Sequence, residues 1–342
     1  MVSRLVRLAT AGAVALGVYV LGAAAANAQP LPISSNGNAV TLVASGLGTP
    51  TSFAFGDGAV FEGDGGNSTG PIPNGGVFHL TGGVGVLLAD SPQFVSGITW
   101  HDNALYVAGG TVTSTGPVWQ LQRWSGWNGT SFSSRQVLIT APPGFDGTNG
   151  IGFGANGRLY LGVDVGLTDG NDDGPPTLSP FLYDILTFNK NGGDPRVFAT
   201  GIRQPWQMAF LPGSNDPFVS DLGQDTNEPE PDDFLLHVSE GQNYGYPDHT
   251  PLWSGTPGPF QAFPPHTDVM GVGIFGSHIY LSEFGVQPPA RVPQVVTIPL
   301  TGGTPHTLLS GFVAPIVGLG INGDRLYIGE LTGDIYSVKI AP

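Results

Sequence analysis

The sequence predicts an all-β fold, a six-bladed β-propeller, and a pattern that occurs six times is the main reason. In each copy an apolar residue that starts a strand is followed eight to ten residues later by an aromatic residue within an apolar triplet. The six pairs are Phe53 with Phe61, Ile98 with Tyr106, Ile151 with Tyr160, Met208 with Phe218, Val272 with Tyr280, and Leu319 with Tyr327. The starts are 45 to 64 residues apart, which suits four-stranded blades with variable loops and fits no helical repeat. Apolar and polar residues alternate within each copy, as in strands with one buried face.

The composition supports this prediction. The chain has 54 glycines and 31 prolines, and only 11% of its residues are charged, which is typical of many tight turns between short strands. Four of the six strand starts directly follow a glycine: Gly97, Gly150, Gly271 and Gly318. The regular apolar triplets argue against disorder outside a short segment near the N-terminus.

The two ends of the propeller are expected to meet in one blade. The last strand pattern, Ile335 to Ile340, is only the third strand of the sixth repeat, so a fourth strand must come from elsewhere. Ala39 to Ala44 precedes the first repeat and has the composition of a strand. We therefore predict that this N-terminal strand joins the last blade and closes the ring, which removes exposed sheet edges.

The first 28 residues have the features of a secretory signal peptide. Arg4 and Arg7 precede an apolar stretch, and Ala26-Asn27-Ala28 is a small-residue cleavage site. The predicted organisation is a signal peptide over 1–28, a linker over 29–38 and the propeller over 39–342. We expect an exported, secreted or periplasmic protein with no membrane span after cleavage. Without cysteine it forms no disulfides, so packing and ring closure must supply its stability.

The charge balance excludes some partners. The formal net charge is −15 for the full chain, and it becomes −17 once the signal peptide with its two basic residues is removed. Such a field repels nucleic acids and anionic membrane surfaces.

The densest group of candidate functional residues falls in the fourth and fifth repeats. The fourth repeat opens with GIRQPWQMAF at 201–210, SDLGQ at 220–224 comes with its second strand, and DDFLLHVSEGQNYGYP follows at 232–247. Arg203 precedes the innermost strand of its blade. Its guanidinium is expected either to bind a carboxylate in the central funnel or to hold a turn or an acid at the rim.

These strings resemble the pyrroloquinoline-quinone (PQQ)-dependent soluble glucose/sorbosone (aldose sugar) dehydrogenases, which are six-bladed propellers. The family pattern contains Gly-x-Arg-Asn-Pro, a Glu-His-Gly-Pro turn, Asp-Asp-Glu-x-Asn-x-Ile and Gly-x-Asn-Tyr-Gly-Trp-Pro. Residues 232–247 align with its last two parts without a gap, and the similarity runs from about Phe53 to the C-terminus. Phe263-Pro264-Pro265-His266, Arg291 and the segment 318–336 also resemble family blades.

The resemblance implies a cofactor and a set of site residues. In the family, basic side chains hold the quinone over the funnel, a Ca²⁺ ion bound partly by backbone carbonyls polarises it, and a histidine accepts a proton from the sugar hydroxyl. Carried over by position, Arg203 would bind PQQ, the carbonyls of Gly223 and Gln224 would face calcium, and Arg291 would be a second carboxylate partner. Oxygen ligands of this kind suit a hard cation.

The chain departs from the family at several polar positions. Asp146 stands where the family has its base histidine, and a carboxylate is a poor base at neutral pH unless burial raises its pKa. His266 is a candidate to replace that base, so the catalytic candidates are Asp146 and His266. Family polar residues are replaced by Gln204, Phe234 and Leu236, and the Glu-His-Gly-Pro turn reads Asp-Leu-Gly-Gln at 221–224.

A second candidate metal site lies at 169–174, DGNDDG, where Asp169, Asn171 and Asp173 match the first half of an oxygen-ligand Ca²⁺ loop. The bidentate glutamate of an EF-hand is absent, because Pro180 stands at its position. The segment is therefore either a partial calcium site or a polar loop between strands.

The leading functional hypothesis is an exported quinoprotein-like oxidoreductase. It would oxidise an aldose sugar or a related alcohol with PQQ and calcium and pass electrons to an external acceptor. The alternative is a non-catalytic propeller that binds a carbohydrate or protein partner through the same funnel. A third hypothesis, metal-dependent lactone hydrolysis, requires several carboxylates to converge on the central tunnel.

Overall fold

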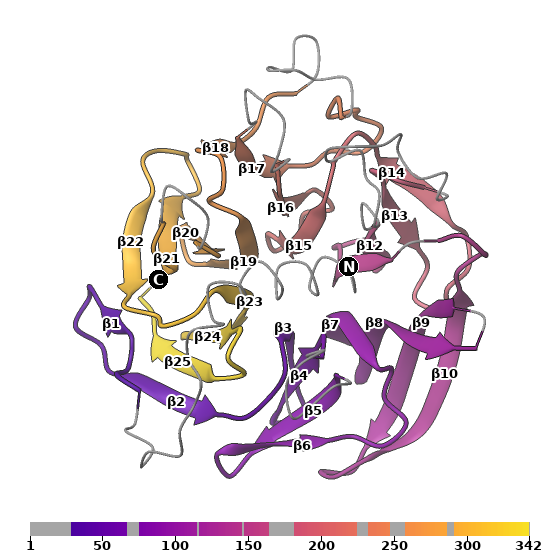
Figure 1. Cartoon of the computed structure of the whole chain (residues 1–342). Helices are drawn as coiled ribbons and strands as arrows, with labels where there is room; N and C mark the ends of the chain where they lie inside the picture. The colour runs from indigo at the N-terminus through magenta and orange to yellow at the C-terminus, as the bar shows by residue number, and fades with distance from the viewer. Residues whose placement is uncertain are drawn as a thin grey trace.

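The computed structural model describes residues 29–66, 75–114, 116–145, 147–163, 181–223, 232–246, 257–285 and 291–341. These residues form strands β1 to β25, which are arranged as six antiparallel sheets around a central axis (Figure 1). The predicted six-bladed β-propeller is thus confirmed. Among the residues described, no helix is long and apolar enough to cross a membrane.

Blades 1 to 3 follow the chain in order. Blade 1 contains β3 (Pro50–Gly56), β4 (Ala59–Asp64), β5 (Gly76–Thr81) and β6 (Val84–Leu87). Blade 2 contains β7 (Phe94–His101), β8 (Ala104–Thr113), β9 (Gly116–Trp127) and β10 (Phe132–Thr140). Blade 3 contains β11 (Thr148–Phe153), β12 (Leu159–Val163), β13 (Ile185–Phe188) and β14 (Arg196–Ala199).

Blades 4 to 6 complete the ring. Blade 4 contains β15 (Pro205–Phe210), β16 (Pro217–Asp221), β17 (Asp233–His237) and β18 (Gln261–Phe263). Blade 5 contains β19 (Val269–Phe275), β20 (His278–Glu283), β21 (Gln294–Pro299), β22 (His306–Ser310) and the short β1 (Ile33–Ser34). Blade 6 contains β23 (Ile316–Asn322), β24 (Arg325–Glu330), β25 (Ile335–Lys339) and β2 (Val40–Ala44).

The repeated sequence pattern corresponds to the two inner strands of every blade. In each pair the first residue lies on the innermost strand and the aromatic residue on the second strand, as with Ile98 on β7 and Tyr106 on β8. We call the end of the ring where the innermost strands begin the upper face, and the end where they turn into the second strands the lower face.

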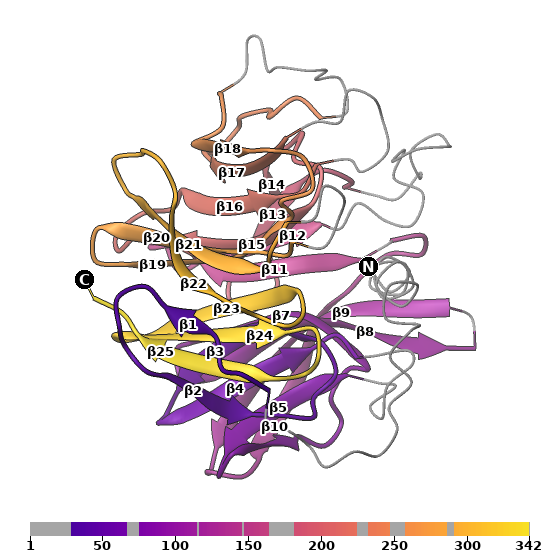
Figure 2. The same ribbon diagram turned by 60° about the vertical axis from the view of Figure 1, so that its left-hand side comes forward.

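The N-terminal segment closes the ring in the predicted way. Strand β2 pairs with β25, and the register places Val40 opposite Val338 and Leu42 opposite Tyr336 (Figure 2). Within the segment expected to be a linker, Ile33 and Ser34 also form a short strand, β1, which pairs with β22 of blade 5. The N-terminal segment therefore pairs with both of the last two blades.

Neighbouring innermost strands pack very closely at the glycines that precede the strand starts. A Cβ atom at Gly150 would lie 2.6 Å from the Trp206 carbonyl oxygen and 2.7 Å from the Gln207 Cα of the next blade. A Cβ at Gly318 would lie 2.5 Å from the carbonyl oxygen of Pro50. Each innermost strand also has a register shift near its beginning. Glycine is therefore needed at these contacts because any side chain would collide with backbone.

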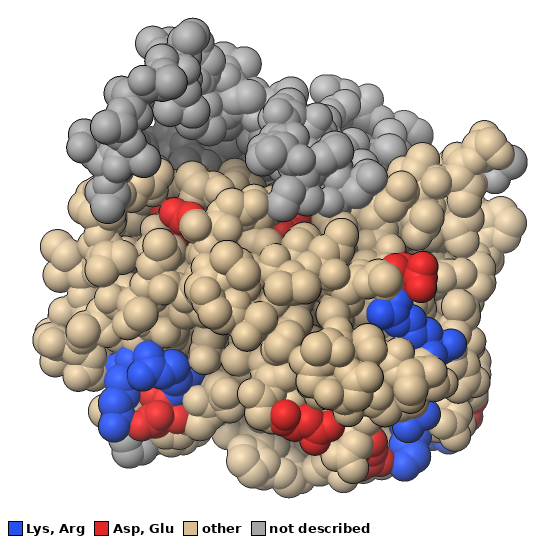
Figure 3. Space-filling view, turned by 90° about the horizontal axis from the view of Figure 1, so that it is seen from below, with Lys and Arg blue, Asp and Glu red and all other residues tan. Residues whose placement is uncertain are grey.

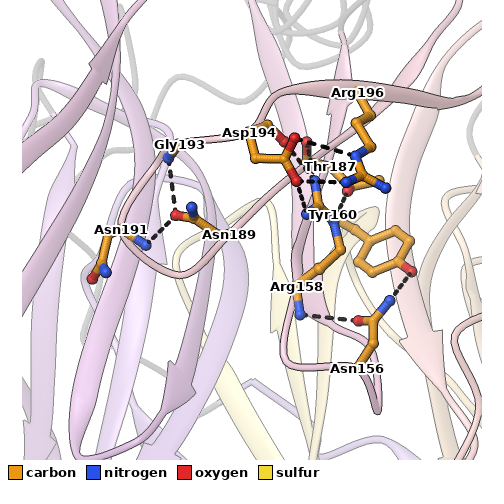
Figure 4. A network of polar contacts seen from close by, with 9 residues as sticks. All are labelled: Asn156, Arg158, Tyr160, Thr187, Asn189, Asn191, Gly193, Asp194 and Arg196. Atoms are coloured by element: carbon orange, nitrogen blue, oxygen red, sulfur yellow. Dashed lines mark hydrogen bonds and ion pairs between the residues drawn. The ribbon is translucent and has the colours of Figure 1, made fainter.

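Charged residues are few on the surface and occur in small mixed groups. In the side view of Figure 3 most of the surface is uncharged, and blue and red residues lie close together along the lower edge. On blade 3, Arg158 donates to Thr187 and Asp194, and Arg196 donates to the same Asp194 carboxylate at 2.7 Å (Figure 4). This network ties the ends of β12, β13 and β14 together.

Ring closure predicts a specific effect of N-terminal truncation. A chain that begins at Ser45 lacks β2, so blade 6 exposes the edge of β25 and the ring opens; we expect loss of the cooperative thermal transition. The matched control is a chain that begins at Asn36, which loses β1 but keeps β2 and should still melt cooperatively. Circular dichroism and calorimetry measure both, and a Ser45 truncation that melts at the full-length temperature would contradict the closure.

The glycine contacts predict a large difference between two alanine substitutions. Gly150→Ala places a methyl group against backbone of the next blade, so we expect a loss of about 1–3 kcal/mol in the free energy of unfolding. Gly258→Ala is the control, because nothing lies within 4 Å of a Cβ built at Gly258. Urea unfolding compares the two variants. Equal stabilities would show that the innermost strands can separate without cost.

Candidate functional site

Acidic residues end the second strand in four of the six blades, at the upper face. They are Asp64, Asp221, Glu283 and Glu330, and all four are buried. Each lies opposite the first residue of its innermost strand, as Asp64 lies opposite Pro50 and Asp221 opposite Pro205. Each also stands three positions after the aromatic residue of the repeat, a sequence signal that the repeat as defined above does not include.

Three of these carboxylates hold the segments that lead into the innermost strands, whereas Glu283 accepts a hydrogen bond from the Gln294 side chain. Asp64 accepts hydrogen bonds from the backbone N–H groups of Gly48 and Thr49, and Glu330 accepts from those of Val313 and Ala314. Asp221 accepts from the Gln204 N–H at 2.7 Å. Because a buried backbone N–H needs an acceptor, these acids position the upper-face loops of their blades.

Arg203 is fully buried at the upper face of blade 4. Its Nη1 atom donates to the carbonyl oxygen of Leu222 at 2.9 Å and to that of Gly223 at 2.5 Å. The guanidinium thus holds the turn that follows β16, which is one of the two arrangements expected from the sequence. Its role toward a ligand stays a prediction.

The segment that aligns with the family pattern supports the loop that carries Arg203. Asn243 forms a bridge with Thr200, the Tyr244 N–H donates to the Thr200 carbonyl, and the Tyr246 N–H donates to the Gly201 carbonyl. Gly201 has a φ of +72° and a Cβ there would lie 2.2 Å from the Asn243 side chain, so only glycine fits. The matching residues of this segment therefore hold the backbone two to three positions before Arg203.

Asp233 connects the Arg203 turn to blade 5, a connection that no sequence pattern indicated. Its Oδ1 accepts from the Gly223 N–H at 2.6 Å, and its Oδ2 accepts from the Asp268 N–H at 2.7 Å. Asp268 and His266 both have positive φ values, +49° and +59°, in the turn before β19. Backbone strain of this kind persists only where the surroundings fix it. Asp233 is one such constraint, and it couples Arg203 and Gly223 of blade 4 to the turn that carries His266.

Arg291 lies on the same face of blade 5. It is half-buried, and its Nε–H has no acceptor among the residues that the structure describes. Burial raises the pKa of Glu283, while the Gln294 hydrogen bond and the Arg291 charge lower it. Arg291 is therefore near Glu283, and the two candidate arginines stand on adjacent blades.

Five candidate site residues are not among those that the structure describes. Asp146, Gln224, Asp169, Asn171 and Asp173 are outside the described residues, so their roles stay predictions. Within the residues described, no group of three or more His, Asp or Glu side chains is arranged to hold a metal ion.

Two of the changed family positions belong to the core. Phe234 and Leu236 are buried in the cluster that contains Ile202 and Tyr244. His237 is exposed at the rim, and its ring stacks on Phe218 with centroids 4.3 Å apart. None of these three side chains is therefore available to contact a ligand in the funnel.

Side chains of blade 4 cross the central channel. The Gln207 Nε2 donates to the Thr51 carbonyl of blade 1 at 2.7 Å, and its Oε1 accepts from the Val272 N–H of blade 5 at 3.2 Å. The Trp206 Nε1 donates to the Val317 carbonyl of blade 6 at 3.0 Å. Gln207 stands where four other blades have glycine, and with residues of all six innermost strands it lines a channel cavity of about 460 Å³.

Comparison with known proteins identifies related folds. No family model matches the chain, and no curated protein matches it. A protein from Thermus thermophilus, provisionally described as an oxidoreductase (glucose dehydrogenase), superimposes with a TM-score of 0.70 at 18% identity over 88% of this chain and 99% of that one. A Trichoderma reesei enzyme of carbohydrate-active family AA12 gives 0.68 at 16% identity over 94% and 100%.

A third solved structure is a gluconolactonase from Xanthomonas campestris, with a TM-score of 0.59 at 12% identity over 95% of this chain and 99% of that one. These superpositions show a shared propeller fold. At sequence identities this low they leave the reaction open.

Burial of Asp221 predicts a pH dependence of stability. Desolvation raises its pKa to about 6, against the hydrogen bond from Gln204 and the charge of Arg203, which lower it. The unfolded pKa is near 4, so between pH 4 and 6 the folded chain holds more protons and the free energy of unfolding falls as pH rises. Relative to Asp221→Asn, the wild type should lose up to about 3 kcal/mol from pH 4 to pH 7.

Urea unfolding at several pH values tests this expectation. Asp57→Asn, at an exposed turn of the lower face, is the matched control and should keep a constant offset from the wild type. If the difference between the wild type and Asp221→Asn does not change with pH, Asp221 does not titrate in this range.

Proposed function

We propose that this chain is an oxidoreductase that acts on a hydroxyl group of a sugar or a related alcohol, at the upper face of blades 4 and 5. The observation that carries the proposal is the placement of Arg203 and Arg291 on adjacent blades of one face, in a chain with a net charge of −15. Local cations in an acidic protein are suited to a specific anionic ligand. The fold that the chain shares with proteins described as a glucose dehydrogenase and a carbohydrate-active enzyme agrees with this substrate class.

The cofactor proposed is PQQ, with calcium. A buried guanidinium and a second, half-buried arginine are suitable partners for quinone carboxylates. Calcium fits less simply, because the Gly223 carbonyl that the resemblance assigns to it already accepts a hydrogen bond from Arg203 at 2.5 Å. A Ca²⁺ ion on this oxygen would be close to a positive charge, so its binding requires Arg203 to turn from Gly223 toward an anion.

The residues of the chain would have separate roles. Asp221 would balance the buried charge of Arg203, which lowers the pKa of this carboxyl against the larger effect of burial. Asp233 fixes both the Gly223 turn and the Asp268 turn, so it would keep the two sides of the site in register. When bound, the quinone would supply the two-electron acceptor for alcohol oxidation. His266, or Asp146, would accept the proton of the substrate hydroxyl. Export of the chain, with removal of the first 28 residues, is part of the same proposal.

A specific observation favours the alternative, a non-catalytic propeller that binds a partner at this face. Phe234 and Leu236 replace polar family residues, and both are packed in the core, so neither offers a polar group to a cofactor. Lactone hydrolysis receives no such support, because Asp64, Asp221 and Glu330 are engaged with backbone N–H groups of their own blades.

The cofactor proposal is tested by titration of the apo-protein with PQQ and Ca²⁺, followed by absorbance. We expect binding that depends on Ca²⁺ and that weakens about 10-fold to 100-fold in Arg203→Gln or Arg291→Gln, because a charge-assisted contact contributes about 1.5–3 kcal/mol. The control is Arg325→Gln on the lower face of blade 6, which should bind as the wild type does. Dye-linked glucose oxidation, read in parallel, separates an enzyme from a binding protein.

Failure has distinct forms in this experiment. No PQQ binding at millimolar Ca²⁺ would reject the quinoprotein hypothesis. Binding that persists in both arginine variants would place the cofactor elsewhere, and binding without oxidation of any sugar or alcohol would favour the non-catalytic alternative.

A further inference from the structure

Glu62 of β4 is a buried carboxyl group in the seam between blade 1 and blade 6, where the two ends of the ring meet (Figure 1). It lies opposite Phe53 of β3 and Phe78 of β5, and directly opposed residues of a sheet point to the same face. Phe53 and Phe78 pack in a cluster with Tyr327 of blade 6, whereas the neighbouring Phe61 packs against blade 2. The Glu62 side chain therefore faces blade 6.

The carboxyl group of Glu62 is isolated in this seam. The residue has no exposed surface, and neither of its side-chain oxygens has a hydrogen-bond partner among the residues described. A buried carboxylate without a cation or hydrogen-bond donors is unfavourable, so the protonated form is preferred. Burial raises the pKa of Glu62 well above its ordinary value, and the charge of Asp64 raises it further.

Blade 1 contributes one further titratable group to the seam. Asp64 stands two positions after Glu62, so it lies on the same face of β4. His79 of β5 lies on the other face, beside Phe61. Most of the other side chains that face the seam from both blades are apolar: Ala44, Leu47, Phe53, Phe78, Leu80 and Ile335. Ionised Glu62 would therefore share an apolar seam with the Asp64 carboxylate.

Blade 6 supplies no cation to this pair among the residues described. Tyr327 faces the seam, with its ring centroid 6.1 Å from that of Phe53, and burial raises its pKa while the charge of Arg325 lowers it. Arg325 itself donates to the Ser337 hydroxyl. The acids Glu330 and Asp334 both accept from Tyr336, which packs in the cluster between blades 5 and 6.

Asp64 links this carboxyl pair to ring closure. The connector 45–49 joins β2 of blade 6 to β3 of blade 1, and Asp64 accepts from its Gly48 N–H at 2.8 Å and its Thr49 N–H at 2.9 Å. In the same connector the Leu47 N–H donates to the Gly333 carbonyl of blade 6 at 3.1 Å. A second negative charge beside Asp64 would thus act on the acceptor that holds the connector in place.

We propose that Glu62 is a pH-sensitive switch of ring closure: its neutral form lets blades 1 and 6 pack together, and its ionisation at alkaline pH loosens the connector and opens the seam. Opening hydrates the carboxylate and moves it away from Asp64. The unfolded pKa of a glutamate is about 4.3 and the folded value is higher, so the stabilisation is complete below the unfolded pKa and is lost as pH rises through the folded one. This proposal does not rest on the function proposed for the upper face.

Native-state hydrogen exchange on the full chain tests the proposal. The amides of β2 and of the connector are followed from about pH 6 to about pH 9 and corrected for the intrinsic pH dependence of exchange. Their opening constant in the wild type should rise by up to about tenfold per pH unit, the largest change that one titrating group produces. Glu62→Gln keeps the shape and cannot ionise, so this rise should disappear. Asp64 is present in both chains, so the ratio of the two isolates Glu62.

Two controls fix the residue and the location. Glu240→Gln removes a carboxyl group at an exposed turn, and its connector amides should behave as those of the wild type. The amides of β12 in blade 3 report on a region away from the seam. Their opening constant should not follow the ionisation of Glu62.

Three results would overturn the proposal. The switch is absent if the connector amides of the wild type open equally at every pH, or if Glu62→Gln shows the same rise as the wild type. An equal rise in β12 would mean that the whole chain loses stability and that the seam does not open by itself.

Infrared spectroscopy tests the protonation of Glu62 separately, with Glu62→Met as an apolar variant of similar length in case Glu62→Gln does not fold. The difference between the wild-type and variant spectra at neutral pH should contain the C=O stretch of a protonated carboxyl group. A difference spectrum with carboxylate bands only would show that Glu62 is already ionised in the closed ring, which rejects the switch. If neither variant folds, the pH dependence of the wild-type connector amides against those of β12 still decides whether the seam opens.

Discussion

Neighbouring blades approach one another most closely where their innermost strands meet, and this backbone contact underlies the rest of the architecture. Gly150 and Gly318 allow adjacent strands to touch where any Cβ would collide with a carbonyl oxygen. The contact fixes the blade spacing around the axis. Ring closure by β2 then holds the blades to that spacing, because the ring cannot open between its first and last blades without separating β2 from β25. In a chain without disulfides, this is a purely non-covalent constraint.

The same constraint positions the polar groups of the upper face. Each second strand ends beside the start of its own innermost strand, so an acid at that point meets the backbone N–H groups of the incoming loop. On blade 4 this carboxylate is Asp221, and it lies near the buried Arg203, whose charge lowers its pKa. Asp233 extends the arrangement to blade 5. The candidate site therefore uses an arrangement that several blades share, an acid at the end of the second strand that holds the incoming loop. In blade 4 the cation Arg203 is added to it.

Sequence reasoning predicted the fold and several residues of the candidate site for identifiable reasons. The repeat was readable because the aromatic residues occupy equivalent buried positions in every blade, and closure was readable because the last blade lacked a strand. Arg203 was identified from its position before an innermost strand, and His266 and Arg291 through a resemblance. All three lie on one face of adjacent blades. Asp233 was overlooked as a structural residue, since its partners, Gly223 and Asp268, use backbone N–H groups that no sequence pattern marks. The acids that end the second strands were detectable at a fixed distance from the aromatic residues, but the repeat as defined ends at those aromatic residues.

The sequence by itself determined the number of blades, the closing strand and the identity of the few cations, because these depend on periodicity and composition. Only the tertiary structure decided that Phe234 and Leu236 are core residues, that Gln207 crosses the channel to Thr51, and that Trp119 lines a cavity between the outer strands of blades 2 and 3. Each of these depends on which side of a strand faces which blade and on the lengths of strands that lie far apart in the chain. Packing between distant segments sets both, and local residue patterns do not encode it.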